Sequence, residues 1–497
     1  MNVNHPDYDL LAEELTKVRD CVEGAPAVKR AEYIYLPHPS QVDKTSTMQR
    51  NRYKEYIGGA EYSGAPDYLR RSLLGKMRVT KTEVELPEKL SYLEQNADGD
   101  GMPLTAAIEY AVNNILQTKW HLLVADYKGA APEGVELSIA EKEALNARAT
   151  IKQYCREAVV NWYFSVVNGV NQLSWVKLLE KSDTFNKVTG ERKAVENYLI
   201  LALDENGDYY QQKLVYEDKK LVSATEPDYQ KVNGMALAWL PVSIVADEEL
   251  PVAMLPRQLG YLAGVCDVEL YNYRVSAEYK ETQRMLKPTM MNKGGKKGDK
   301  EIFAELNGGR GYILLGQVNN LPEGWEPSIL SSSADMADFH WYFEETKKKI
   351  NALNGRADGN SAMTATEANI IAADQNALLE TIADNCEHSF KRMIAYCGMF
   401  EGLYSVQDIE QKLDDITIAM PRNFAQPMLT VEQRQQTVNE FMAGLISKAE
   451  AQRQLAQGGA TVEDLELINL ELEEEPPKMQ TTNAEAVQPQ TNEEAVP

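Results

Sequence analysis

The spacing of apolar residues predicts helices in both halves of the chain. Over residues 103–118 an apolar residue recurs every three or four positions, which gives a helix one apolar face. Residues 256–286 contain no proline after Pro256 and predict one uninterrupted helix, about 46 Å long. Further helices are expected over 334–353 and 364–404, and two shorter ones follow toward the C-terminus.

Between residues 160 and 250 the pattern becomes typical of strands. The apolar segments 198–203 and 209–216 flank Asn206–Gly207, a strong signal for a two-residue hairpin. We therefore expect an antiparallel sheet packed against the earlier helices, which makes the fold class α+β. Other strands are predicted at 121–125, 173–179 and 416–420, the last of them standing alone.

Charge narrows the classes of protein that fit. The chain has 497 residues, and 75 acidic against 51 basic side chains give a net charge of −24. This argues against a conventional DNA-binding domain, whose affinity comes from basic contacts to phosphate, and against a polybasic membrane-surface protein. Residues 461–497 carry −9 of that charge, so the remaining body carries −24 + 9 = −15 and is still acidic.

The cysteines and the apolar runs indicate the compartment in which the protein occurs. Five cysteines are odd in number, widely scattered and free of any C-x-x-C pair, which indicates a reducing compartment. The N-terminus has no basic-then-apolar signal pattern. The longest apolar run, 235–246, is interrupted by Pro241 and is too short to span a membrane, so no membrane is expected as a partner.

Catalytic motifs are missing from the sequence. The chain has no G-x₄-G-K-[ST] phosphate loop, no H-E-x-x-H and no G-x-S-x-G. Residues 96–101 (NADGDG) match part of a calcium loop, but Ala107 stands where a bidentate Glu is required. A turn that precedes the next helix is the favoured interpretation, and no metal or cofactor is expected.

Four lysines gather in a glycine-rich stretch at 290–301. They are Lys293, Lys296, Lys297 and Lys300. They have the chemistry to touch nucleic-acid phosphates, but a solvated, glycine-rich loop is the simpler interpretation when the stretch is taken alone.

The order of these elements resembles that of the portal proteins of tailed bacteriophages. A sheet domain is followed by a long helix, a small Gly/Lys-rich excursion, a second helix that breaks at a polar loop, and a long helix opened by a capping box. The local sequence is similar to a podophage portal family formerly labelled as a domain of unknown function. The matching stretches are residues 53–62, 85–104, 161–180, 256–279 and 363–385.

The resemblance implies a portal fold with a wing of helices and antiparallel sheet, long stem helices, a small α/β clip and a helical crown. The implied divisions are a wing with an N-terminal helical arm (1–255), stem helix 1 (256–287), the clip (288–333), stem helix 2 (334–353), a tunnel loop (354–363), a long wing helix (364–404), a wing strand with crown helices (405–470) and a disordered acidic tail (471–497).

The resemblance also implies a function, which is not enzymatic. Portal proteins form a ring, usually of twelve copies, at one capsid vertex of the virion. Double-stranded DNA passes through the ring, without sequence specificity, during genome packaging and ejection. The implied partners are the major capsid protein and scaffold, the terminase, and a tail adaptor or head-completion protein. Assembly would take place in the host cytoplasm.

The resemblance also implies functional or structural roles for particular residues. The tunnel loop would bring Asn354, Arg356, Asp358 and Asn360 to the DNA channel, with Arg356 reaching phosphate. The clip lysines would face a partner protein. Thr364 and Glu367 would cap the long wing helix. Packing between subunits or within one subunit is equally expected for Leu259, Leu262, Cys266, Leu270 and Tyr273 of the first stem helix.

Two other classes of protein stay open. One is a structural ring or tail adaptor that is not a portal, although adaptors are usually much shorter than this chain. The other is a nucleic-acid enzyme with a carboxylate metal site, since 75 acidic residues offer many possible ligand sets and no spacing selects one.

Overall fold

The computed structural model divides the chain into two compact units, Met1–Phe424 and Ala425–Pro497. The residues that it describes are 4–37, 47–78, 81–128, 147–250 (without 168, 186, 218, 219 and 233), 255–285, 289–293, 326–330, 365–422 and 431–445, and the single positions 305, 341, 344, 348, 424, 447, 451 and 452.

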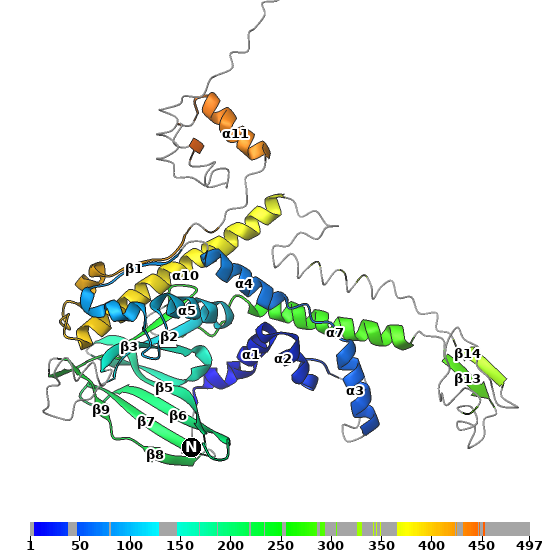
Figure 1. The fold of residues 1–497 in the computed structure, drawn as a ribbon, viewed down its shortest axis with the longest axis horizontal. Coiled ribbons are helices and arrows are strands. Elements are labelled where there is room, and N and C mark those ends of the chain that lie inside the picture. The colour runs from blue at the N-terminus through cyan, green and yellow to red at the C-terminus, as the bar shows by residue number, and fades with distance from the viewer. Residues whose placement is uncertain are drawn as a thin grey trace, which may run out of the picture. The chain divides into compact units, whose positions relative to one another are not determined.

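The N-terminal part of the first unit is helical (Figure 1). Its helices are α1 (Pro6–Glu23), α2 (Ala25–Arg30), α3 (Thr47–Gly59), α4 (Ala65–Met77) and α5 (Leu104–Thr118), with the short 3₁₀ helices η1 (Glu32–Ile34) and η2 (Glu88–Glu94). Helix α5 confirms the helix predicted over 103–118. Its predicted apolar face, including Leu104, Ile108 and Val112, is fully buried.

A small antiparallel sheet forms the centre of this unit. It has the order β12-β2-β3, and its strands are β2 (Trp120–Lys128), β3 (Arg148–Cys155) and β12 (Val242–Ala246). Strand β2 confirms the strand predicted at 121–125, and its residues Leu122, Leu123 and Val124 are all buried. A 3₁₀ turn, η3 (Arg156–Ala158), leads from this sheet into the next one.

A larger antiparallel sheet confirms the strands predicted between residues 160 and 250. Its order is β4-β5-β6-β7-β8, and β9 pairs with β7. The turn between β6 and β7 lies at Asn206–Gly207, as predicted. Gly207 has a φ of +86°, which favours glycine. The strands are β4 (Val159–Val167), β5 (Val170–Phe185), β6 (Arg192–Leu203), β7 (Tyr209–Glu217), β8 (Lys220–Ala224), β9 (Asp228–Tyr229) and the separate pair β10 (Lys231–Val232) and β11 (Met235–Ala236).

The strand predicted to stand alone at 416–420 has a partner. Strand β15 (Thr417–Ala419) pairs antiparallel with β1 (Glu83–Glu85), with Val84 opposite Ile418. An isolated strand leaves its backbone N–H and C=O groups without partners, and β1 supplies them from more than 300 residues away in the sequence. The prediction was wrong because β1 is too short for its pattern to be recognised.

The helix predicted from residue 256 begins later. Helix α7 spans Ala263–Met285, and the segment before it is not helical. The guanidinium of Arg156 donates hydrogen bonds to the carbonyl oxygens of Pro256 and Gln258, and the Leu262 N–H donates to Leu116 O at 3.2 Å. These contacts hold the segment against η3 and the end of α5, so the backbone groups that make them are not available for helical hydrogen bonds.

Helix α10 (Ala365–Phe400) confirms a long helix close to the predicted range of 364–404. It packs across β12, β2 and β3 and beside α5 (Figure 1). Its buried face, which includes Leu379, Cys386, Phe390 and Ile394, joins the main hydrophobic core. The helix ends before Gly402, whose φ is +69°, and the 3₁₀ turn η4 (Ile409–Asp415) follows.

A second hydrophobic cluster lies apart from the main core. It joins α1, α2 and α3 to α7 through buried residues such as Val18, Val28, Tyr53 and Tyr273. The apolar side of α7 is therefore covered by helices from the N-terminal part of the same chain.

Little is described of the predicted clip and second stem helix. Strands β13 (Thr289–Lys293) and β14 (Glu326–Leu330) form an antiparallel pair within 288–333. In 334–353 only Trp341, Glu344 and Lys348 are described, and each is helical. In the second unit, α11 (Val431–Met442) agrees with a predicted short helix. The predicted acidic tail, 471–497, lies outside the described residues.

Taken as a whole, the described residues are a mixture of helices and antiparallel sheets, which is consistent with the predicted α+β class. None of the helices described here is long and apolar enough to cross a membrane.

Candidate functional site

Most residues that the sequence proposed for the site lie outside the described part of the chain. This holds for the tunnel-loop residues Asn354, Arg356, Asp358 and Asn360, for the lysines Lys296, Lys297 and Lys300, and for Thr364. Lys293 is the last residue of β13, and Glu367 lies in the first turn of α10. Their proposed roles stay predictions.

The described residues of the first stem helix pack within the chain. Leu262, Cys266, Leu270 and Tyr273 are almost completely buried, and Leu259 packs against the same cluster that includes Cys266, Leu270 and Tyr273. Of the two interpretations left open by the sequence, these side chains therefore support packing within one subunit.

Polar side chains join α7 to the segment between α3 and α4. The carboxylate of Glu269, which is fully buried, accepts hydrogen bonds from the backbone N–H and the hydroxyl of Ser63. Burial raises the pKa of Glu269 above its ordinary value, and the hydrogen bonds from Ser63 and Gly64 oppose that shift. Further along α7, Ser276 and Lys280 both bond to Glu61. The contacts fix α7 against its own N-terminal helices.

The exposed stripe of α7 is mostly polar and acidic. Asp267, Tyr271, Arg274 and Glu278 recur at helical spacing and face away from the buried cluster. Asp267 pairs with Lys17 of α1 at 2.7 Å, and the Arg274 guanidinium donates to the carbonyl of Tyr35 at 2.7 Å. The helix therefore offers solvent a narrow polar surface rather than an apolar one.

A separate surface is formed where α4 and α5 lie side by side. The Arg70 guanidinium donates to Asn113 Oδ1 at 2.9 Å, and Arg78 pairs with Glu109 at 2.8 Å. At the Arg78 end the two helices and the residue after β15 enclose a hollow of about 380 Å³. We call this hollow the α4/α5 groove.

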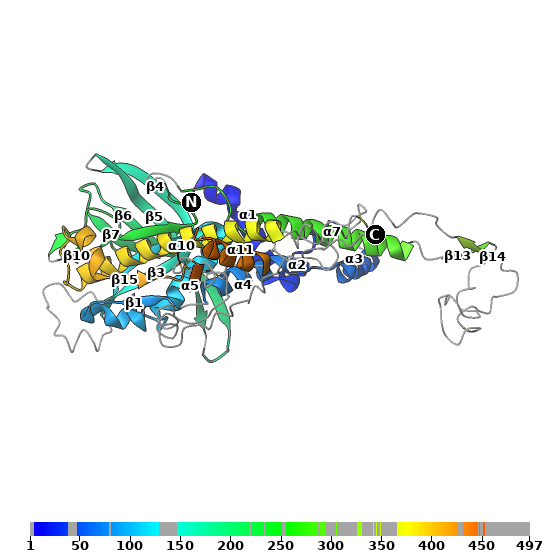
Figure 2. The same ribbon diagram turned by 90° about the horizontal axis from the view of Figure 1, so that it is seen from above.

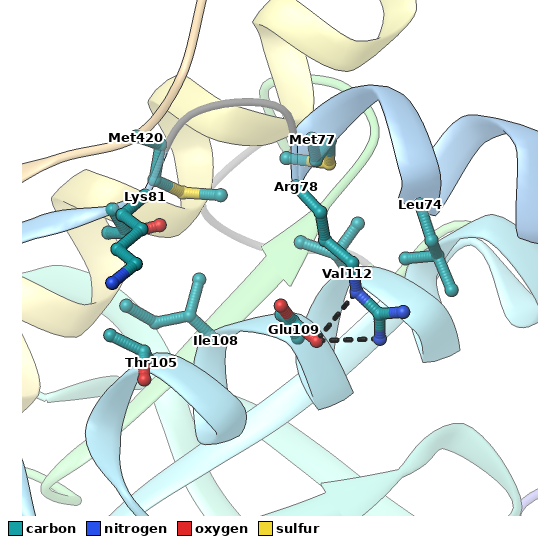
Figure 3. A pocket seen from close by; sticks show the side chains of 10 residues that line it. Leu74, Met77, Arg78, Lys81, Thr105, Ile108, Glu109, Val112 and Met420 are labelled. Atoms are coloured by element: carbon teal, nitrogen blue, oxygen red, sulfur yellow. Dashed lines mark hydrogen bonds and ion pairs between the residues drawn. The ribbon is translucent and has the colours of Figure 1, made fainter.

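Figure 3 shows how the groove is built. Its apolar lining consists of Leu74, Met77, Ile108, Val112 and Met420, and its polar rim includes Arg78 paired with Glu109, and Lys81. Tyrosine, methionine and arginine are the side chains most enriched at protein interfaces, and exposed Tyr68 and Tyr110 stand on the same two helices.

Sequence reasoning missed this groove, although a signal was present. Residues 66–82 carry five basic side chains against the single acid Asp67, in a chain whose net charge is −24. The basic residues of this run are Arg70, Arg71, Lys76, Arg78 and Lys81. The rest of the groove comes from α5 and from residue 420, which sequence spacing does not connect to α4.

The calcium-like segment at 96–101 is a turn, as favoured. Asp98 Oδ1 accepts hydrogen bonds from the backbone N–H groups of Asp100 (2.8 Å) and Met102 (3.0 Å), and Asn96 Oδ1 accepts from Gly101. Burial raises the pKa of Asp98, but these backbone donors outweigh it, so the pKa lies below its usual value. Across the described residues, no group of three or more His, Cys, Asp or Glu side chains is placed to hold a metal ion.

Comparison with known proteins finds matches among solved structures alone. No family model and no curated protein matches the chain. Among solved structures, the chain is similar to one described as the neck of an empty GTA particle computed with C6 symmetry, with a TM-score of 0.37 and 12% sequence identity. The match covers 85% of this chain and 96% of that chain. A likeness at this TM-score carries no argument about function.

Proposed function

We propose that this protein is the subunit of a portal ring at one capsid vertex of a tailed bacteriophage. The ring is the conduit through which double-stranded DNA is packaged and ejected, and the docking site for terminase and for the tail adaptor. The proposal comes from the resemblance of the sequence to portal proteins. The structural feature that supports it is the order of the helices and strands along the chain.

That order is the observation that carries the proposal. Helix α7, about 34 Å long, is followed by the strand pair β13 and β14 and then by α10, about 54 Å long. In the portal pattern these elements are stem helix 1, the clip and the long wing helix, and stem helix 2 is predicted at 334–353, between the clip and the tunnel loop. The segment at 354–363, directly before α10, is then the tunnel loop.

The negative net charge of the chain suits a channel through which DNA slides better than a protein that binds DNA tightly. A basic wall binds duplex DNA by releasing its counterions, and each phosphate contact makes binding tighter and more dependent on salt. A channel through which DNA must slide works best when its wall is neutral or acidic. The exposed stripe of α7, which carries Asp267 and Glu278 against Arg274, has a small acidic excess.

The first experiment is electron microscopy of the purified full-length protein. A closed ring with an axial opening wide enough for duplex DNA is the expected result. A monomer, or a closed ring without such an opening, would overturn the proposal. Duplex binding measured by fluorescence anisotropy should be weak, salt-sensitive and independent of sequence, and tight sequence-specific binding would equally contradict it.

The second experiment tests the tunnel loop. Replacement of residues 354–363 by a Gly/Ser linker of equal length should leave ring assembly intact and sharply reduce DNA packaging. As a control, the same type of replacement at 187–191, in the turn between β5 and β6, should leave packaging unchanged. Normal packaging by the first variant would remove the tunnel loop from the proposal.

A further inference from the structure

Two cysteine thiols from distant parts of the sequence meet in the cluster that joins the N-terminal helices to α7. Cys21 lies in the last turn of α1, and Cys266 lies in the first turn of α7. Both residues are completely buried, and one thiol donates a hydrogen bond to the other. Figure 1 and Figure 2 both show α1 beside α7. Because both cysteines are free, two unreacted sulfur atoms are held in contact.

The surroundings of the two thiols hold the helices together at this point. The Tyr62 hydroxyl donates a hydrogen bond to the carbonyl oxygen of Cys21 at 2.6 Å, and its phenol group interacts with both thiols. One turn earlier on α1, Lys17 forms an ion pair with Asp267 of α7 at 2.7 Å. The contact between the sulfur atoms is therefore part of a packed pair of helices.

The other three cysteines have no thiol beside them, and all three belong to the described residues. Cys155 interacts with the charged groups of Glu157 and Arg19. Cys386 and Cys397 are separated by about 16 Å along α10, and each interacts with carboxylates. A disulfide requires its two Cα atoms to lie within about 7 Å of each other. The pair in the second hydrophobic cluster is thus the one that can form such a bond.

The closed contact protects these thiols from reaction. The hydrogen bond with Cys21 and burial both raise the pKa of Cys266, so this thiol keeps its proton at neutral pH. Oxidants react with the thiolate, and neither side chain is exposed to solvent. A reaction therefore requires a local opening in which α1 separates from α7. When the helices close again, they return the two sulfur atoms to contact.

We propose that Cys21 and Cys266 are a site of oxidative modification, at which a peroxide forms a disulfide that joins α1 covalently to α7. In the opened state the thiolate of one cysteine attacks a peroxide oxygen, which gives a sulfenic acid and releases hydroxide. After closing, the second thiol attacks the sulfenic sulfur, forms the S–S bond and releases water. Overall the two thiols lose two protons and two electrons, and one hydrogen peroxide becomes two water molecules.

The bond restrains a large part of the chain. It closes a loop of about 245 residues, and a disulfide that closes a long loop removes many conformations from the unfolded chain. In a reducing cell the pair stays as thiols, whereas outside the cell the disulfide persists. That order of events rests on the proposed function, because a virion leaves the cell. The chemistry of the two sulfur atoms does not depend on it.

Mass spectrometry of the oxidised protein tests the site. Full-length protein is purified with a reductant, freed of it, treated with hydrogen peroxide in native buffer at pH 8, quenched with catalase and alkylated. Digestion without reductant should yield peptides joined through Cys21 and Cys266 as the main disulfide. The proposal is wrong if the two cysteines are recovered as alkylated thiols or as sulfonic acids.

Thermal stability separates the disulfide from other effects of peroxide. Oxidation should raise the unfolding temperature of the wild type by about 2–4 °C more than that of Cys21→Ala or Cys266→Ala. Each oxidised protein is compared with its own reduced form, so the effect of the substitution cancels, and methionines oxidise in all of them. Cys155→Ala is the matched control, and it should keep both the disulfide and the temperature rise. A disulfide without this rise would contradict the restraint on the chain.

Electron microscopy of the same samples keeps this inference separate from the proposed function. Rings whose subunits form no disulfide with peroxide would overturn this inference and leave the ring function in place. A monomer that forms the disulfide would keep this inference and overturn the ring function.

Discussion

Arg156 is a buried cation that joins two segments of backbone. Its guanidinium donates to the carbonyl oxygens of Thr118, Pro256 and Gln258, and lies 5.4 Å from the ring centre of Trp120. Burial lowers the pKa of Arg156 to about 10, so the side chain is still charged at neutral pH. The carbonyl oxygens need this donor because they lie at the end of α5 and in the non-helical segment before α7.

Replacement of Arg156 by methionine should therefore destabilise the protein. The apolar side chain preserves the length but leaves the carbonyl groups without a donor, and we expect the free energy of unfolding to fall by about 2–4 kcal/mol. Urea unfolding followed by tryptophan fluorescence measures the change. Arg71→Met, at a 69% exposed side chain, is the control and should change stability by less than about 0.5 kcal/mol.

His121 makes stability depend on pH. Its ring is fully buried, with Nε2 2.9 Å from Gln153 Oε1, and burial lowers its pKa from the ordinary 6.5 to about 4. Between these two values the unfolded chain binds a proton that the folded chain does not. This group therefore stabilises the fold less as pH falls through that window.

The expected contribution of His121 is about 2 kcal/mol between pH 7 and pH 5. The variant His121→Gln lacks the titrating ring, so its unfolding free energy should lose correspondingly less over the same interval. Comparison of the two proteins cancels the carboxylates that titrate in both. Equal losses in wild type and variant would mean that the His121 ring is accessible to protons in the folded state.

At the scale of elements, the start of α7 depends on a glycine. A Cβ added to Gly260 would lie 2.5 Å from the backbone carbon of Gln117, whereas one added to Gly264 would meet nothing within 4 Å. The first position marks a close approach of two backbone segments. The second lies on the exposed side of the helix.

The two glycines give a matched pair of substitutions. Gly260→Ala should lower the thermal unfolding temperature because two backbone segments must separate, with a loss of about 2 kcal/mol or more. Gly264→Ala should raise stability by about 0.5–1 kcal/mol, as alanine favours a helix over glycine. Differential scanning fluorimetry of both variants checks the opposite signs, and two changes of the same sign would contradict this account of the α7 start.

Local periodicity predicted the elements whose pattern is long or strongly marked. Helices α5 and α10 and the β6–β7 hairpin follow from apolar spacing and from Asn206–Gly207, since these signals are contained within one segment. The β1–β15 pair and the true start of α7 depend on contacts between segments that are distant in sequence. No window along the chain contains both partners, so spacing alone did not reveal them.

The candidate site also combines features that one sequence segment shows with features that depend on distant segments. The basic run that contains Arg78 and Lys81 is visible in the sequence, but the apolar floor of the groove includes Ile108 and Met420. These residues meet only after α4, α5 and the end of β15 have packed together. The roles taken from the portal resemblance, such as that of Arg356, stay predictions.

At the scale of the whole molecule, the hydrophobic cores identified in the described residues belong to the first unit. Both clusters draw all their members from the range that ends at Phe424. Among the described residues, the apolar packing of this unit therefore comes from the unit itself.

A chain truncated after Phe424 should thus keep its stability. We expect its main thermal transition to lie within about 2 °C of the full-length value, because the truncation removes no member of the two clusters found in the described residues. Calorimetry of the two proteins at equal subunit concentration makes the comparison. A transition lowered by about 5 °C or more would show that residues 425–497 stabilise the first unit.

The cluster that joins the N-terminal helices to α7 cannot form until late in the synthesis of the chain. Its members lie within residues 18–60 and 263–277, so the first group leaves the ribosome about 200 residues before the second. At 5–20 residues per second this delay is roughly 10–40 s. During that interval Val18, Val28 and Tyr53 lack the α7 residues that cover them in the folded chain.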